Sequence, residues 1–249
     1  MTPRIRKSFV IAILLALLAS LTGCKLTPIT DRPAHIPNGY ERVYAKDFDH
    51  ADDLADVVCT DADAWRIREA EGRSFLELFA ASDYRPTYRS PGNIALFKPG
   101  TATDFVLDLD MMQSGREYNH RDLCLFFGVV DADHYYYAHM ATLGDDNAHQ
   151  VFIVNEAPRT PITTQRTVGV DWGTDEWHHV RLVRDAGEGT IRVYFDDMDN
   201  PVLEASDTTF TSGYIGVGSF DDTGRFDNVT VWASGWDDTP CEVFDGEEE

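Results

Sequence analysis

The chain has 249 residues and a formal net charge of −22, from 21 Lys and Arg against 43 Asp and Glu. This acidic balance argues against a nucleic-acid partner and against binding to anionic lipid headgroups, because a negative surface repels phosphate groups. With 43% hydrophobic residues, the chain is long enough to bury one sizeable core, and we expect a single folded domain.

The first 23 residues have the features of a bacterial lipoprotein signal peptide. Three basic residues precede the apolar run SFVIAILLALLASLTG, which has the length of a signal-peptide core. Leu21-Thr22-Gly23-Cys24 resembles a lipobox, in which the chain is cleaved before the Cys and that Cys is lipidated. The resemblance implies a cell-envelope protein that contacts a bacterial membrane only through the lipid on Cys24. The outer membrane or the surface is favoured because Lys25, and not Asp, follows. An ordinary secretory signal and an uncleaved anchor are the alternatives.

The remaining chain divides into a tether, a folded domain and a tail. Residues 24–42 contain three prolines and no periodicity, which is typical of a tether. Residues 43–241 carry the strand patterns, and residues 242–249 form an acidic tail. Cys59 and Cys241 lie near the two ends of the domain and could form a disulfide, an assignment that the sequence leaves open.

Short strand patterns follow one another along the domain. Residues 49–65 contain either a short helix or an Ala-Asp-rich loop, and DFVLDLDMM (104–112) alternates apolar and polar residues. Residues 122–142 are predicted to form a hairpin around Asp131-Ala132-Asp133. Five further strand patterns lie within residues 149–157, 177–185, 190–197, 214–220 and 225–232. Many strands without alternating helices predict an all-β fold, an antiparallel two-sheet jelly-roll sandwich.

Two segments resemble a known superfamily. EWHHVRLVRDAGEGTIRVYFDDMDNPVLEA (176–205) and GYIGVGSFDDTGRFDNVTVW (213–232) are similar to the concanavalin A-like lectin/glucanase and laminin-G-like sandwiches. The nearest resemblance, over residues 43–233, is to the bacterial domains of the 3-keto-disaccharide hydrolase type (domain of unknown function 1080). The resemblance implies a concanavalin A-like sandwich with a carbohydrate partner on its concave sheet.

The carboxylates of SFDDTGRFDN (219–228) have two interpretations. The resemblance places the first and last strands side by side, which would bring Asp49 close to Asp227. It implies a structural calcium ion held by these two carboxylates, with Gly218 as a carbonyl donor. The alternative is a solvated turn at Asp222-Thr223-Gly224 that needs no ion.

Polar and aromatic residues in the middle of the chain suggest a sugar cleft. Tyr rings stack on pyranose faces, and Arg, Asn and His side chains bond sugar hydroxyls. The predicted ligand-binding residues are Arg121, Tyr137, His139, His149 and Asn155. The alternative is that these residues are structural, with half-buried tyrosines and with histidines bonded to loop carbonyls.

The sequence offers only weak signals of catalysis. Retaining glucanases of the resembled superfamily carry a Glu-x-Asp-x-x-Glu strand, and this chain contains no Glu-x-Asp. His139 paired with Asp145 or Asp122 is the remaining acid–base candidate. We therefore expect a lipid-anchored saccharide-binding domain. A glycoside hydrolase acting on 3-keto or related sugars and a structural or protein-interaction sandwich are the alternatives.

Overall fold

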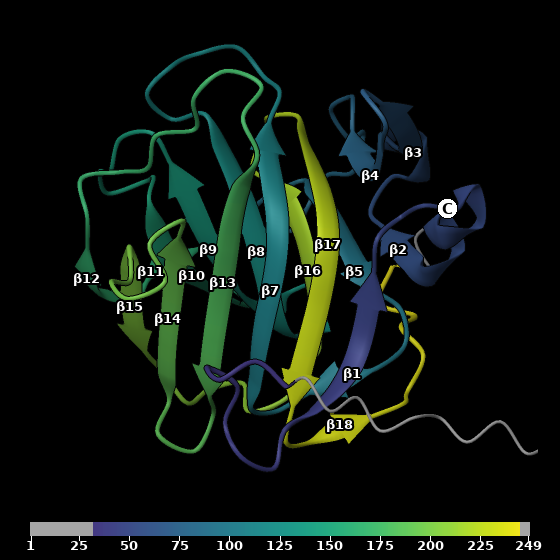
Figure 1. Cartoon of the computed structure of the whole chain (residues 1–249). Coiled ribbons are helices and arrows are strands. Elements are labelled where there is room, and N and C mark those ends of the chain that lie inside the picture. Colours follow the sequence, from purple (N-terminus) through teal and green to yellow (C-terminus); the bar gives the residue numbers. More distant parts are fainter. Residues whose placement is uncertain (1–31, 245–249) are drawn as a thin grey trace, which may run out of the picture. The chain divides into compact units, whose positions relative to one another are not determined.

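Two antiparallel sheets pack face to face in the computed structural model, which describes residues 32–244 (Figure 1). The predicted all-β, antiparallel two-sheet jelly-roll sandwich is confirmed. All of the described strands lie in the compact unit that begins at His35. Cys24 and the predicted signal peptide lie outside the described residues, as does the end of the acidic tail. No helix in residues 32–244 is long and apolar enough to cross a membrane.

The order of strands in the two sheets follows from their hydrogen bonding. The nine-stranded sheet runs β12 (Thr163–Arg166), β15 (Leu203–Ser206), β14 (Thr190–Phe195), β13 (His178–Asp185), β7 (Phe105–Gln113), β17 (Gly224–Ala233), β4 (Arg73–Leu78) and β3 (Trp65–Ala70), with β1 (Glu41–Lys46) also paired to β17. The seven-stranded sheet runs β11 (Thr160–Pro161), β10 (Gln150–Asn155), β9 (His134–Ala141), β8 (Asp122–Asp131), β16 (Tyr214–Ser219), β5 (Asn93–Phe97) and β2 (Val57–Cys59). A small sheet joins β6 (Thr101–Ala102) to β18 (Trp236–Asp237), and the two 3₁₀ helices are η1 (Ala51–Asp56) and η2 (Ala62–Ala64).

Several local predictions are confirmed. Strands β8 and β9 form the expected hairpin, and residues 49–65 contain η1 and η2 on either side of β2. Strand β1 pairs with β17, so the first strand of the domain and its last long strand lie side by side. On β7, the residues Leu107 and Leu109 face the core between the sheets, whereas Asp108 and Asp110 face outward. This alternation is the pattern that the sequence predicts.

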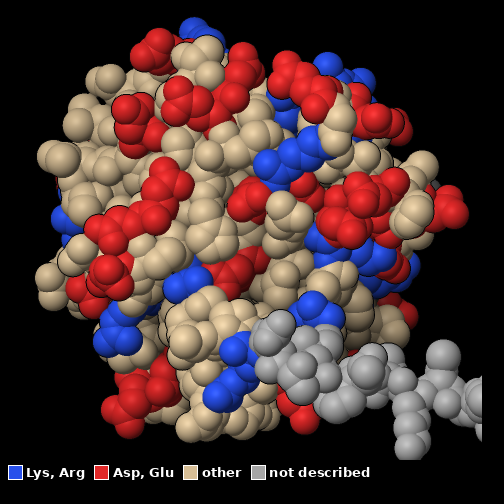
Figure 2. Space-filling model, in the orientation of Figure 1, with Lys and Arg blue, Asp and Glu red and all other residues tan. Residues whose placement is uncertain are grey.

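The outer face of the nine-stranded sheet is polar. Asp108 accepts hydrogen bonds from Arg181 (2.7 Å), and His179 contacts it at 3.1 Å. Hydrogen bonds from His179 to Asp108 and Asp110 raise the pKa of His179 to about 9, which favours its charged form at neutral pH. Figure 2, which shows this side of the molecule, has Asp and Glu interspersed with Lys and Arg. Such a face needs no continuous covering layer, and its apolar residues Val106 and Trp232 are covered by Ile36.

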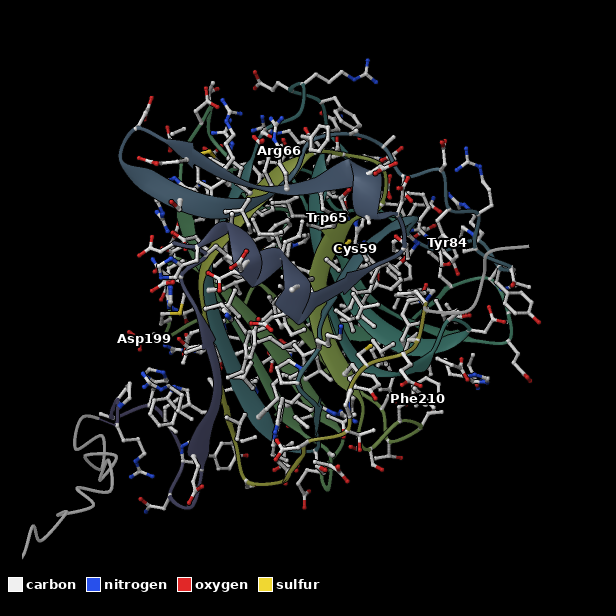
Figure 3. All side chains as sticks on the ribbon, turned by 90° about the vertical axis from the view of Figure 1, so that its right-hand side faces the viewer. Cys59, Trp65, Arg66, Tyr84, Asp199 and Phe210 are labelled. Carbon is white, nitrogen blue, oxygen red and sulfur yellow. The ribbon has the colours of Figure 1, made fainter. Side chains whose placement is uncertain are left out.

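The outer face of the seven-stranded sheet is apolar and is covered by the chain itself. We call it the covered face; its strand residues include Leu96, Cys124, Phe126, Val129, Tyr135, Tyr137, Phe152, Val154 and Tyr214. Cys241, Val243 and Phe244 of the C-terminal segment pack on it. Tyr84, from the segment between β4 and β5, contacts the Phe244 ring with centroids 5.8 Å apart. Figure 3 shows Tyr84 on the side of the seven-stranded sheet that faces away from Trp65 and the core.

The possible disulfide between Cys59 and Cys241 does not form. Cys59 packs against the core between the sheets, whereas Cys241 packs on the covered face. The two thiols therefore lie on opposite sides of the seven-stranded sheet. Among the cysteines in residues 32–244, the structure has no disulfide.

Candidate functional site

Tyr137 lies in the covered face and has no exposed surface. Its ring stacks between Phe126 and Phe152, with centroid separations of 5.8 and 5.1 Å. Its hydroxyl accepts a hydrogen bond of 2.9 Å from Nη1 of Arg159. Because the exposed fraction of Tyr137 is 0%, the ring offers no face to a pyranose, which differs from its predicted role as a stacking platform.

His139 and Asp122 lie close together, but both are buried. Nε2 of His139 is 3.4 Å from Oδ2 of Asp122, and the exposed fractions of the two residues are 3% and 0%. The backbone N–H of His149 donates to Nδ1 of His139, so the ring proton of His139 lies on Nε2. Oδ2 of Asp122 also accepts hydrogen bonds from the backbone N–H of Phe220 and the thiol of Cys124. A pair enclosed in this way meets no substrate, and its observed role is to tie β8, β9 and the segment after β16 together.

The other predicted acid–base partner, Asp145, is not paired with His139. Its carboxylate contacts Nε2 of His120 at 2.7 Å, and both side chains are about half exposed. The backbone carbonyl of Asp145 accepts hydrogen bonds from Gln150 and Arg166. Asp145 therefore belongs to the loop between β9 and β10 and not to the buried pair.

The three remaining predicted ligand residues are not gathered into one cleft. Arg121 is buried and donates to the carbonyl of Gly173 at 2.6 Å. His149 is fully buried beside Thr167, and burial is the main reason that its pKa falls to about 4, with His139 and Arg166 contributing. Asn155 is exposed at the far end of β10, opposite His134. Tyr137 and His139 share the covered face, but Asn155 does not join them.

Two of the residues predicted to hold calcium, Asp227 and Gly218, lie in different sheets. Asp227 lies in the nine-stranded sheet and is ion-paired with Arg73. Gly218 lies in the middle of the seven-stranded sheet, where β5 and β8 pair with it on both sides. Its hydrogen atom is required there, because a Cβ would collide with the carbonyl oxygen of Asn93. Among the described residues, the groups of three or more clustered potential ligands include neither Asp49 nor Asp227.

Polar side chains reach the surface where two of the covering segments meet. The backbone N–H of Arg159 donates to the carbonyl of Arg89, which joins the segment after β10 to the segment before β5. The guanidinium of Arg159 lies over the ring of Phe220, 4.3 Å from its centroid, and donates to the carbonyl of Asn147 at 2.9 Å. Arg89 donates to Oδ1 of Asn147 at 3.2 Å. We call Arg89, Asn147, Arg159, Phe220 and Asp221 the Phe220 rim.

Carboxylates cluster beside the Phe220 rim. Asp122, Asp221 and Asp222 each place one oxygen within 4.8 Å of the others. Oδ2 of Asp222 accepts hydrogen bonds from the Tyr118 hydroxyl (2.7 Å) and from the backbone N–H of Asp122 (2.9 Å). Burial, followed by repulsion from Asp122 and Asp221, raises the pKa of Asp222 to about 6. Burial and the neighbouring carboxylates therefore disfavour the ionisation of Asp222.

Sequence reasoning found part of this region. It identified the run of carboxylates in SFDDTGRFDN but assigned a ligand role to Asp227 and not to Asp221 or Asp222. Arg89 and Asn147 have no local signal, because each lies in a polar loop whose place in the fold depends on the covering layer. Phe220 could have been noticed as an aromatic residue directly before a run of carboxylates, a position that an ordinary solvated turn does not require.

Comparison with known proteins shows the fold. No protein-family model and no curated protein matches the sequence. Among solved structures, the chain is similar to a mutant of the GH43 protein BlXynB from Bacillus licheniformis (12% identity over 76% of this chain and 39% of that chain, TM-score 0.52). It is also similar to a xylan beta-1,4-xylosidase from Bacillus halodurans C-125 (10% identity over 82% and 41%, TM-score 0.50). The present chain thus spans about two fifths of each of these proteins.

A carbohydrate-binding module, CBM66 from Bacillus subtilis, aligns at a TM-score of 0.49. The identity is 19%, over 71% of this chain and 94% of that chain. At such low identities, likeness to a solved structure shows a shared architecture, and the roles of individual residues must come from the site itself.

Replacing Tyr137 tests whether the covered face is a packed layer. We expect Tyr137→Ala to lower the free energy of unfolding by about 3–5 kcal/mol, because it leaves a cavity between Phe126 and Phe152. Tyr137→Phe keeps the ring and loses only the hydrogen bond from Arg159, so we expect a loss of about 1 kcal/mol. Urea unfolding of the two variants measures both values. A Tyr137→Ala variant within 0.5 kcal/mol of the unmodified protein would show that the ring lies in an open cleft.

Proposed function

We propose that this chain binds a saccharide at the Phe220 rim. The observation that carries the proposal is the fixed arrangement of two arginines, an amide and a carboxylate around a partly exposed aromatic ring. Arg89 and Arg159 are both held by Asn147, so neither side chain has to be ordered when a ligand arrives. Asp221 and Arg89 are exposed, which leaves a carboxylate acceptor and guanidinium donors facing solvent.

This combination of groups suits neighbouring hydroxyls. A guanidinium offers several N–H donors in one plane, and a carboxylate accepts two hydrogen bonds in a similar geometry. A sugar that presents two adjacent hydroxyls can bond both kinds of group while its apolar C–H surface lies against Phe220. Tyr137 and His139 support the rim from beneath: Tyr137 holds Arg159, and the His139 ring lies 6.2 Å from the Phe220 ring.

The fold comparison supports a carbohydrate as the ligand class. One similar structure with a TM-score of 0.50 is a xylan beta-1,4-xylosidase, and a second, at 0.52, is a GH43 protein. The finer resemblance to the 3-keto-disaccharide hydrolase type remains part of the proposal. Hydrolysis would need an acid–base pair within reach of the sugar, and His139 and Asp122 are both buried. Binding without turnover is therefore the function that the geometry supports best.

A glycan array followed by calorimetry tests this proposal. We expect a restricted set of glycans to bind the purified protein, and we expect Arg89→Ala to weaken the best of them at least tenfold, which is a loss of about 1.4 kcal/mol. Arg192→Ala is the matched control, because it removes an arginine from β14 in the nine-stranded sheet, where Arg192 contacts Glu204. The control should bind as the unmodified protein does.

Two results would contradict saccharide binding at the rim. No binding to any glycan on a broad array that includes oxidised sugars would argue for a protein partner instead. Equal losses in Arg89→Ala and Arg192→Ala would show that binding depends on overall charge and not on the rim. Incubating each hit with the protein and analysing the products by chromatography separates binding from hydrolysis.

We also propose that Cys24 carries the lipid that anchors the protein in the cell envelope. The proposal rests on the order of basic residues, apolar run and Cys in residues 1–24. In a bacterial host fed a labelled fatty acid, the unmodified protein should incorporate label and sediment with membranes. Cys24→Ala should lose both properties, whereas Cys59→Ala should keep them. Label that persists in Cys24→Ala would rule out this site of attachment.

A further inference from the structure

Asp122 and Asp222 differ from the other buried carboxylates in lacking a Lys or Arg partner; the one basic side chain beside them is His139, whose Nε2 is 3.4 Å from Oδ2 of Asp122. Asp53 pairs with Lys46, Asp227 pairs with Arg73, and Glu77 contacts three arginines. In residues 32–244, no Lys or Arg forms an ion pair with Asp122 or with Asp222. Asp221 adds a third carboxylate to the same cluster and has no such pair either. The other buried carboxylates are each paired with Lys or Arg, whereas this cluster of three has only the His139 ring beside it.

One oxygen of Asp122 provides a second, independent observation. Asp122 is fully buried, and its Oδ1 atom has no hydrogen-bond partner. Its other oxygen, Oδ2, accepts hydrogen bonds from the backbone N–H of Phe220 and from the thiol of Cys124, and it contacts the His139 ring. A buried carboxylate oxygen without a donor is costly, by about 1–3 kcal/mol or more. Asp122 therefore brings to the cluster a fully buried carboxylate that has one oxygen without a donor.

The spacing and chemistry of the three carboxylates fit a hard divalent cation. Calcium binds oxygen ligands at about 2.3–2.6 Å, so two ligands of one ion lie at most about 5 Å apart. The three oxygens fall inside this limit, at 4.8 Å or less. Asp221 is exposed, which gives a hydrated ion a route to the cluster from the surface.

A softer metal at the neighbouring group of Asp122, Cys124 and His139 does not fit as well. Those three residues also cluster within 4.8 Å, but all are buried. A thiol must lose its proton to bind a metal, and burial raises the pKa of Cys124 well above its usual value. The lone pair on Nδ1 of His139 is occupied by the N–H of His149, and Nε2 carries the ring proton. The oxygen cluster is the better cation site.

We propose that Asp122, Asp221 and Asp222 bind one calcium ion at the edge of the Phe220 rim. The ion supplies the positive charge that Lys or Arg supplies to the other buried carboxylates. It also ties the start of β8 to the segment between β16 and β17, because Asp122 lies on the first and the other two ligands on the second. This proposal does not depend on saccharide binding, and its test contains no sugar.

Terbium luminescence and calorimetry test the site directly. Tb³⁺ replaces Ca²⁺ at oxygen sites, and the hydroxyl of Tyr118, 2.7 Å from Asp222, places a sensitising ring beside the cluster. With the purified protein, we expect saturable Tb³⁺ emission on tyrosine excitation, displacement by Ca²⁺, and a stoichiometry near one by calorimetry. We expect Asp221→Asn to weaken Ca²⁺ binding at least tenfold.

The exposed carboxylate is the appropriate one to change, because Asp122→Asn could disturb folding. Asp199→Asn is the matched control: it makes the same charge change in the exposed acidic turn after β14. Calcium binding by this control should stay within twofold of the unmodified protein. Equal weakening in both variants would show diffuse binding to an acidic surface and would overturn the proposal. Failure to detect any saturable binding at millimolar Ca²⁺ would also overturn it.

Discussion

The seven-stranded sheet is apolar on both faces, and the rest of the structure depends on covering its outer side. Phe126, Tyr135, Tyr137 and Phe152 lie in this face and are all at most 1% exposed. Burying one large apolar side chain contributes about 1.5–3 kcal/mol, so uncovering these four rings would cost on the order of 10 kcal/mol. That is comparable to the whole stability of a typical domain. A ligand of micromolar affinity supplies only about 8 kcal/mol and could not offset this cost. The covering segments therefore stay in place, and recognition is confined to their edge.

The same layer determines which groups reach solvent. Arg159 connects the buried ring of Tyr137 to the partly exposed ring of Phe220, and its backbone joins it to Arg89. Asp122 contacts the buried side chains of Cys124 and His139, and it also belongs to the carboxylate cluster with Asp221 and Asp222. The Phe220 rim and the proposed calcium site are thus two sides of one structural junction. Both lie at the start of β8, where segments that are distant in the sequence meet.

Alternation of apolar and polar residues predicted the sandwich because it is a local signal. It placed Leu107 and Asp108 on opposite faces of β7, and it placed the β8–β9 hairpin correctly. Alternation did not predict that the outer face of the seven-stranded sheet is covered. In HYYYAHM, alternation separates Tyr135 and Tyr137 from Tyr136, but it does not show that both sets are buried. The residues that cover this face include Tyr84, Arg159, Cys241, Val243 and Phe244, and they come from segments whose sequences resemble ordinary loops. Asp227 was assigned to a metal because the family resemblance implied that it lies near Asp49, whereas its actual partner, Arg73, comes from a strand that no local pattern connects to it.

Hydroxyl-radical footprinting with mass spectrometry tests most directly the claim that the seven-stranded sheet is closed by its own chain. The account predicts strong protection of Tyr135 and Tyr137 in the native protein, with labelling of the partly exposed Tyr118 and Tyr88 at the rates of accessible tyrosines. Unfolding in urea should label all four equally, which provides the reference. Labelling of Tyr137 in the native protein as fast as Tyr118 would contradict the account. It would show an open aromatic cleft on this face, so that the sheet itself and not its edge would be the candidate binding site.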